Sequence, residues 1–186
     1  DRGAANPADS KLGNLLAKAF YQVNDDNRVG LTVEYYNKRY DEDELNYNGY
    51  SIMPGFTYTD NYNKDTNERL RVGFEHQMMM NTLLADSLNW SVNYQDSSSL
   101  NKNYDTTPFN GRRMREREAS DKTVQFDTQL SKLVDIQGNA HEFTYGMNYL
   151  YNQFELDNTD HKLDAGTVSP GSTGIPDANV TQWGLF

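Results

Sequence analysis

Four arginines lie close together in the run GRRMRERE at residues 111–118: Arg112, Arg113, Arg115 and Arg117. A guanidinium is planar, stays charged at ordinary pH and can form paired hydrogen bonds with phosphate or carboxylate groups. The run therefore predicts contact with an anionic group. The simpler interpretation, which we prefer, is a solvated loop in which these arginines pair with neighbouring glutamates.

Two other features could bind a metal. His161, within DNTDHKLD, carries an imidazole, which is a common metal ligand, and the acidic run at 41–44 could hold a hard cation through its oxygens. The acidic spacing fits no EF-hand loop, so we interpret both features as solvated loop residues. The chain has no cysteine and no nucleophile–base pair, phosphate loop or paired catalytic carboxylates. The sequence therefore predicts neither an enzyme nor a metal centre.

The composition limits the classes of protein that remain. The formal net charge of the 186 residues is −10, which argues against nucleic-acid binding. Hydrophobic residues make up only 36% of the chain, yet it contains 13 Tyr, 8 Phe and 2 Trp. A polar chain with many aromatics suits a structure that needs only one apolar face per strand.

Alternation of apolar and polar residues, which is typical of strands, occurs in six segments. These segments are 14–23, 28–38, 67–79, 88–96, 121–134 and 140–155, and a seventh begins at 180. No apolar run is long enough for a transmembrane helix, which needs about 20 residues. A strand of a membrane barrel needs only about ten alternating residues. The pattern therefore predicts an all-β, antiparallel transmembrane β-barrel section of six or seven strands.

In the middle of these strands, at 15–23, 29–35, 70–74, 88–94, 124–130 and 143–151, the apolar phase carries no charge, whereas the opposite phase carries Lys18, Glu34 and Arg71 among others. A lysine or arginine facing lipid at the bilayer midplane costs about 2–4 kcal/mol. We therefore predict that the apolar phase faces lipid and the other phase a polar lumen. The predicted lipid-facing residues are Val29, Leu31, Val33, Tyr35, Leu70, Val72, Phe74, Leu88, Trp90, Val92, Tyr94, Phe143, Tyr145, Met147 and Tyr149.

The predicted connections alternate in length. Short turns at 24–27, 80–87 and 135–139 alternate with long polar stretches at 39–66, 97–120 and 156–179. Bacterial outer-membrane barrels have short periplasmic turns and long external loops. This places the arginine run and His161 in external loops. A soluble antiparallel β-sandwich also alternates, but its strands are usually only five or six residues long.

Several segments together resemble the TonB-dependent receptors of Gram-negative outer membranes, and most closely their haem and haemoglobin receptor branch. The segments are LLAKAFYQ at 15–22, RVGLTVEYYNKRYDED at 28–43, DTNERLRVGFEH at 65–76, LADSLNWSVNYQDS at 84–97, RRMRERE, LSKLV, AHEFTYGMNYLY at 140–151 and WGLF at 183–186. Each segment is weak evidence alone, but the set covers nearly the whole chain.

The resemblance implies a 22-stranded barrel with an N-terminal plug, which imports haem iron with energy supplied through TonB. Residues 1–186 would be part of that single barrel domain, with the plug and the later strands absent. Its partners would be outer-membrane lipid and lipopolysaccharide, TonB through the plug region, and haem or a haem-carrying host protein outside the cell. Haem would be cargo, and the chain itself would need no cofactor.

The haem-binding histidines of the family cannot be carried over. They lie on the plug and near FRAP and NPNL motifs, and neither motif occurs here. The four arginines, which could bind haem propionates, and His161 therefore remain the candidate ligand contacts. The alternatives are a siderophore receptor, a passive porin or a soluble β-sandwich binding module.

Overall fold

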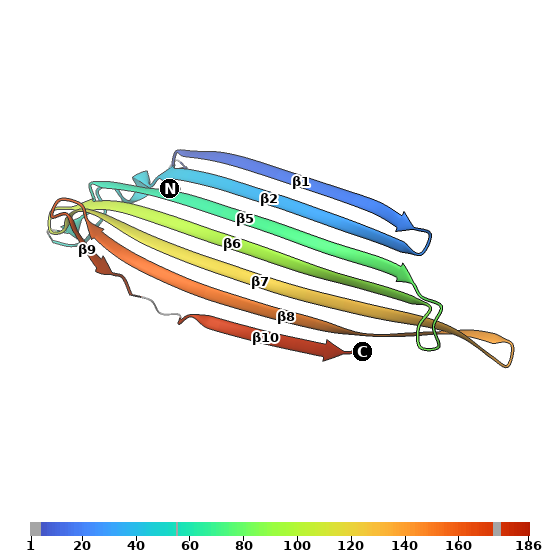
Figure 1. The fold of residues 1–186 in the computed structure, drawn as a ribbon. Helices are drawn as coiled ribbons and strands as arrows, with labels where there is room; N and C mark the ends of the chain where they lie inside the picture. Colours follow the sequence, from blue (N-terminus) through green and yellow to red (C-terminus); the bar gives the residue numbers. More distant parts are fainter. Residues whose placement is uncertain (1–4, 55, 173–175) are drawn as a thin grey trace.

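The computed structural model describes residues 5–54, 56–172 and 176–186, and its long strands form one curved antiparallel layer (Figure 1). The order across the sheet is β1-β2-β5-β6-β7-β8-β10, with β9 paired to one end of β8. The strands are β1 Ala8–Asn24, β2 Asn27–Asp43, β5 Asp60–Met79, β6 Ser87–Thr107, β7 Gly111–Ile136, β8 Asn139–Lys162, β9 Thr167–Pro170 and β10 Ala178–Leu185. The predicted all-β antiparallel class is confirmed.

A smaller unit interrupts the sheet between β2 and β5. It consists of a 3-10 turn, η1 (Leu45–Tyr47), followed by the hairpin of β3 (Ser51–Met53) and β4 (Phe56–Thr57). Among the described residues, no helix is long and apolar enough to cross a membrane.

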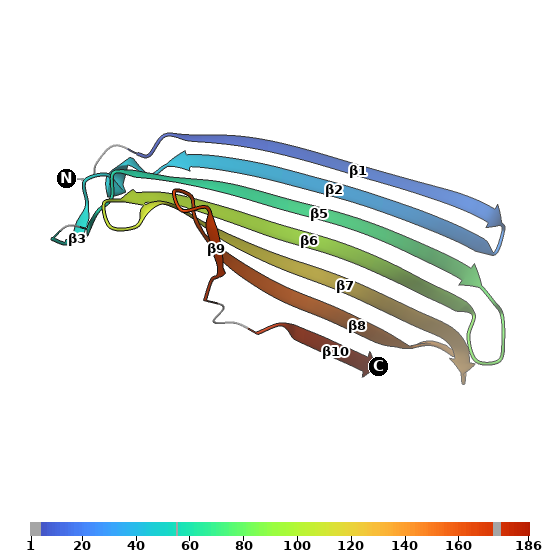
Figure 2. The ribbon, with the colours of Figure 1, turned by 60° about the vertical axis from the view of Figure 1, so that its left-hand side comes forward.

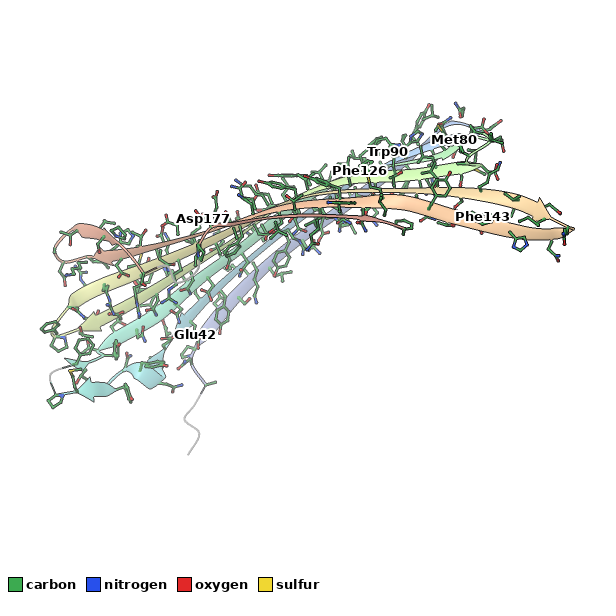
Figure 3. The ribbon with its side chains drawn as sticks, turned by 90° about the horizontal axis from the view of Figure 1, so that it is seen from below. Glu42, Met80, Trp90, Phe126, Phe143 and Asp177 are labelled. Carbon is green, nitrogen blue, oxygen red and sulfur yellow. The ribbon has the colours of Figure 1, made fainter. Side chains whose placement is uncertain are left out.

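Short connections join the strands at one end of the sheet, which we call the turn end. They comprise residues 25–26, 80–86 and 137–138, close to the predicted short turns. At the last of these, Gln137 and Gly138 both have positive φ, 55° and 80°, as a tight hairpin turn requires. We call the opposite end, where η1 and β9 lie, the loop end (Figure 2). Met80 and Phe143 lie at the turn end, far from Glu42 (Figure 3).

The register joins the apolar phases of separate strands into one face. Val33 pairs with Val72, Val72 with Tyr94, Tyr94 with Val124, and Val124 with Tyr151. Directly paired residues project from the same side of an antiparallel sheet. We call this side the apolar face and the other side the polar face. All the residues predicted to face lipid lie on the apolar face, although their contact with lipid stays a prediction.

Almost nothing packs against the apolar face. Leu31 and Phe143 are 46% and 51% exposed, and the only buried apolar residues in the described part of the chain are Ala85 and Met114. A β-sandwich would cover such a face with a second sheet. The only other sheet that the structure describes is the two-stranded β3–β4 hairpin. The soluble sandwich therefore does not account for this chain.

The strands are much longer than the sequence predicts. The stretch 97–120, predicted as an external loop, is almost entirely strand, because β6 and β7 continue to a turn at 108–110. The predicted loops at 39–66 and 156–179 also contain long continuations of β2, β5 and β8. Strand β7 has 26 residues, whereas crossing a membrane takes about 9–11. Alternation fades in these extensions because most positions on both faces are polar there, but the backbone ladder needs no apolar side chain.

Candidate functional site

The arginine run lies at the start of β7 and not in a loop, so its predicted location is wrong. Alternation along β7 places Arg113, Arg115 and Arg117 on the polar face and Arg112 on the other side. His161, predicted in a loop, is in β8 and pairs with Met114, which also projects from the apolar-face side. The structure therefore groups three of the five candidates and separates Arg112 and His161 from them.

A buried carboxylate holds two of the three grouped arginines. Asp105, on β6, accepts hydrogen bonds from Arg113 Nη2 at 2.9 Å and from Arg115 Nη2 at 3.2 Å. Its side chain is 0% exposed, whereas those of the two arginines are 22% and 33% exposed. These bonds are charge-assisted and so among the stronger ones in proteins. We call these three residues the Asp105 triad.

Asparagines continue the network across β5 and β6. Asn103 Nδ2 donates to Asn63 Oδ1 at 2.6 Å, and Arg115 donates in turn to Asn103 Oδ1. Beside them, Asn101 donates to Asp65. All these residues belong to the polar-face phase, so the side-chain bonds run from strand to strand. Such cross-strand pairs stabilise a sheet whose extension has almost no apolar core.

The segment after β2 folds over this network. Glu44 accepts hydrogen bonds from Asn61 Nδ2 at 2.6 Å and from Asn63, both on the polar face of β5. Tyr47 and Tyr58 pack edge to face above them, with ring centroids 6.4 Å apart. The segment thereby forms one wall of an open cavity of about 350 Å³, which we call the Arg–Asn cavity. Its lining comprises Glu44, Tyr47, Tyr58, Asn61, Asn63, Asn101, Asn103, Arg115 and Arg117.

The side chains that line the Arg–Asn cavity suit a polar anion. Two guanidiniums line it against the single carboxylate of Glu44. Arg115 Nε is buried and has no hydrogen-bond partner among the described residues, which leaves one donor of that guanidinium unused. The volume falls at the lower end of the range of ligand pockets, roughly 300–1,000 Å³. Sequence reasoning missed Asp105 and the asparagines, because none of them belongs to a recognisable motif, and it considered Glu44 only as part of the acidic run at 41–44.

Arg112 serves a different purpose on the other side. Its backbone N–H and its Nε donate to the two carboxylate oxygens of Asp164, at 2.8 and 2.7 Å. These bonds lower the pKa of the Asp164 carboxyl below its usual value and raise that of Arg112. Gly111 has a φ of +65°, and a Cβ there would lie 2.4 Å from Asp164 Oδ2. The pair therefore fastens the turn after β8 to the start of β7.

His161 belongs to an aromatic row on the apolar-face side of the loop end. The row runs from Tyr62 through Tyr104 and Met114 to His161, and the two tyrosine rings stack with centroids 4.4 Å apart. Burial raises the pKa of the Tyr62 phenol. The sheet itself stands between His161 and the Arg–Asn cavity, so this histidine cannot share a ligand with Arg115 or Arg117.

The acidic run at 41–44 is divided in the same way. Asp41, Glu42 and Asp43 alternate between the two faces of β2, and Glu42 accepts a hydrogen bond from Asn6 at 2.9 Å. No group of three or more His, Cys, Asp and Glu side chains suited to a metal ion occurs in the part of the chain that the structure describes.

Comparison with known proteins agrees with this architecture. The family model described as "TonB dependent receptor-like, beta-barrel" matches residues 3–186, and no curated protein matches the chain. Receptors of this family lie in the outer membrane of Gram-negative bacteria, act with TonB and are transporters, not enzymes. The exposed apolar face, the long strands and the match over nearly the whole chain lead to one conclusion: the chain belongs to the TonB-dependent receptor family and supplies a section of its β-barrel.

Proposed function

We propose that this barrel section takes part in importing haem iron, and that the Arg–Asn cavity is a contact site for the anionic edge of haem. The observation that carries the proposal is the position of Arg115 and Arg117 in a cavity on the polar face. In this proposal the polar face lines the lumen of a barrel of about 22 strands. The ligand is bound and passed inward without covalent chemistry.

The chemistry of haem suits the site. Haem carries two propionates, and each arginine can offer a carboxylate two parallel hydrogen bonds. The resemblance of the strand segments to haem and haemoglobin receptors supports the same ligand. An axial ligand for the iron would come from elsewhere in the receptor, since His161 lies on the other side of the sheet.

The remaining partners follow from the two faces. The apolar face would contact outer-membrane lipid, with lipopolysaccharide around the strand extensions at the loop end. The plug, which would engage TonB, would be encoded outside residues 1–186. A ferric siderophore is the alternative cargo, because many such chelates are also anionic.

The test is a haem titration of the full-length receptor in detergent, followed by the Soret absorbance. We expect Arg115→Gln and Arg117→Gln each to weaken haem binding about tenfold, equivalent to roughly 1.4 kcal/mol. Arg112→Gln is the matched control, since it removes a neighbouring guanidinium on the other side of the sheet. Unchanged affinity in the first two variants would contradict the proposed site. Binding of a ferric siderophore but not haem would replace the proposed cargo.

A further inference from the structure

The connection between β5 and β6, residues 80–86, has a defined fold of its own. Thr82 N–H donates to Ala85 O at 2.8 Å, and Ala85 N–H donates to Thr82 Oγ1 at 3.1 Å. Met80 N–H donates to Asp86 O at 2.8 Å, which closes the turn. Ala85 is completely buried. We call this unit the 80–86 turn.

The 80–86 turn is fastened to the apolar-face side of the sheet. Lys132 Nζ donates to Thr82 O at 2.8 Å and to Asp86 Oδ1 at 2.6 Å, and Tyr145 Oη donates to Leu84 O at 2.7 Å. Lys132 and Tyr145 both belong to the apolar-face phase of their strands. The turn is therefore bent across β7 towards β8, as the green connection shows in Figure 1.

Two adjacent leucines occupy the tip of this turn. Leu83 is 91% exposed and Leu84 is 74% exposed. Tight turns are normally built from Gly, Pro, Asn, Asp and Ser. Because the carbonyls on either side of Leu83 are hydrogen-bonded to Lys132 and Tyr145, the backbone cannot easily turn these side chains inward. The fold thus presents a pair of large apolar side chains away from the protein.

The height of the turn matches the lower part of the predicted lipid belt. On β8 the uninterrupted apolar phase runs from Phe143 to Tyr151 and is centred on Met147. A strand tilted by about 35–45° rises roughly 2.5 Å per residue along the barrel axis. Tyr145 and Phe143 therefore lie about 5 and 10 Å from the centre of the belt. Both distances are within the half-height of about 12 Å of an apolar barrel band.

We propose that the 80–86 turn is a membrane anchor that inserts Leu83 and Leu84 among the acyl chains of the periplasmic leaflet. The inference rests on the proposed contact between the apolar face and lipid. The turn brings no net charge into that position, since Lys132 and Asp86 neutralise each other at 2.6 Å. Two carbonyls at its tip, those of Thr82 and Leu84, are already hydrogen-bonded, which lowers the cost of moving this backbone into an apolar medium.

Nitroxide labelling tests the anchor, and residues 1–186 themselves contain no cysteine that would compete for the label. Leu83→Cys and Leu84→Cys would be labelled in the full-length receptor, reconstituted in phosphatidylethanolamine–phosphatidylglycerol vesicles. Electron paramagnetic resonance then compares collisions with oxygen, which enters lipid, and with a water-soluble nickel chelate. Asp25→Cys, in another turn at the same end, is the aqueous control, and Val92→Cys marks the apolar face.

We expect the oxygen-to-nickel collision ratio at positions 83 and 84 to exceed that at position 25 severalfold and to approach that at position 92. A ratio equal to that of position 25, with position 92 in lipid, overturns the anchor alone. Labels shielded from both reagents show that protein covers the turn, which also overturns it. Nickel accessibility at position 92 instead overturns the lipid contact of the apolar face.

Discussion

Asp105→Asn is the sharpest perturbation of the loop end, because it removes one charge while keeping the size of the side chain. The fully buried carboxylate pairs with both Arg113 and Arg115. Removing one partner of a buried ion pair costs about 3–5 kcal/mol. The two arginine side chains are partly exposed, at 22% and 33%, and solvent screening reduces this cost. We expect a loss of about 2–3 kcal/mol, or roughly 30–150-fold in the opening equilibrium.

The loss should be local, so the assay must resolve single segments. The assay is hydrogen–deuterium exchange of the full-length receptor in nanodiscs. Exchange should become roughly 30–150-fold faster in the tips of β6 and β7, which flank the turn at 108–110. Segments around Val92 and Phe126 should exchange at unchanged rates, since they lie far along the same strands. Asp164→Asn is the control, because it breaks an arginine–aspartate pair whose members are both well exposed.

Two results would refute this reasoning. Unchanged exchange in Asp105→Asn would mean that the backbone ladder alone holds the extension and that the triad contributes little. An equal effect of Asp164→Asn would mean that burial does not distinguish the two pairs.

The other predictions concern the apolar face and the Arg112–Asp164 pair. Val92→Arg places a charge on the apolar face, at a cost of about 2–4 kcal/mol near the midplane, and should sharply lower folding yields in lipid vesicles, whereas Asn93→Arg should be tolerated; equal yields would disprove the lipid assignment. Hydrogen bonds from Arg112 lower the pKa of the Asp164 carboxyl from its usual 3.8. The stability that the ionised carboxylate contributes is therefore present above pH 3.8, and it is lost as the pH falls through the lower pKa of the folded protein. A nitroxide at Ala165→Cys should therefore become mobile only in that acidic range, and an Asp164→Asn background should make it mobile at every pH.

The middle of each strand could be predicted from the sequence, because apolar and polar residues alternate there. In Val29 to Tyr35 every second residue is apolar, and the register places all of these on one face with Leu70 and Val72. Even an exception to the alternation has a local cause. Phe20 lies on the polar face and covers Gly30, and the Arg28 guanidinium stands 4.6 Å from the centre of its ring.

The loop end could not be predicted from alternation. Asn101, Asn103 and Asp105 occupy alternate positions of β6 on the polar face. A sequence so rich in polar residues is equally typical of a loop. The missing information was pairing. The turn formers in TTPFNG, at 106–111, lie in the middle of the stretch, and a hairpin centred on them sets Asp105 opposite Arg113. Pairing residues in order on either side of that turn would have predicted that Asp105 lies opposite Arg113.

The middle of these strands and their loop end are stabilised by different interactions. Membrane insertion therefore depends on other residues than ligand binding does. In the middle, the apolar face contributes through its proposed contact with lipid, and charged residues of that phase, such as Lys132, lie towards the strand ends. At the loop end, the triad and the asparagines contribute through hydrogen bonds between strands, with hardly any buried apolar side chain. The Arg–Asn cavity lies at the loop end and on the polar face, away from the proposed lipid belt in both respects. Substitutions that retune the cavity should therefore alter ligand affinity without changing how the barrel enters the membrane.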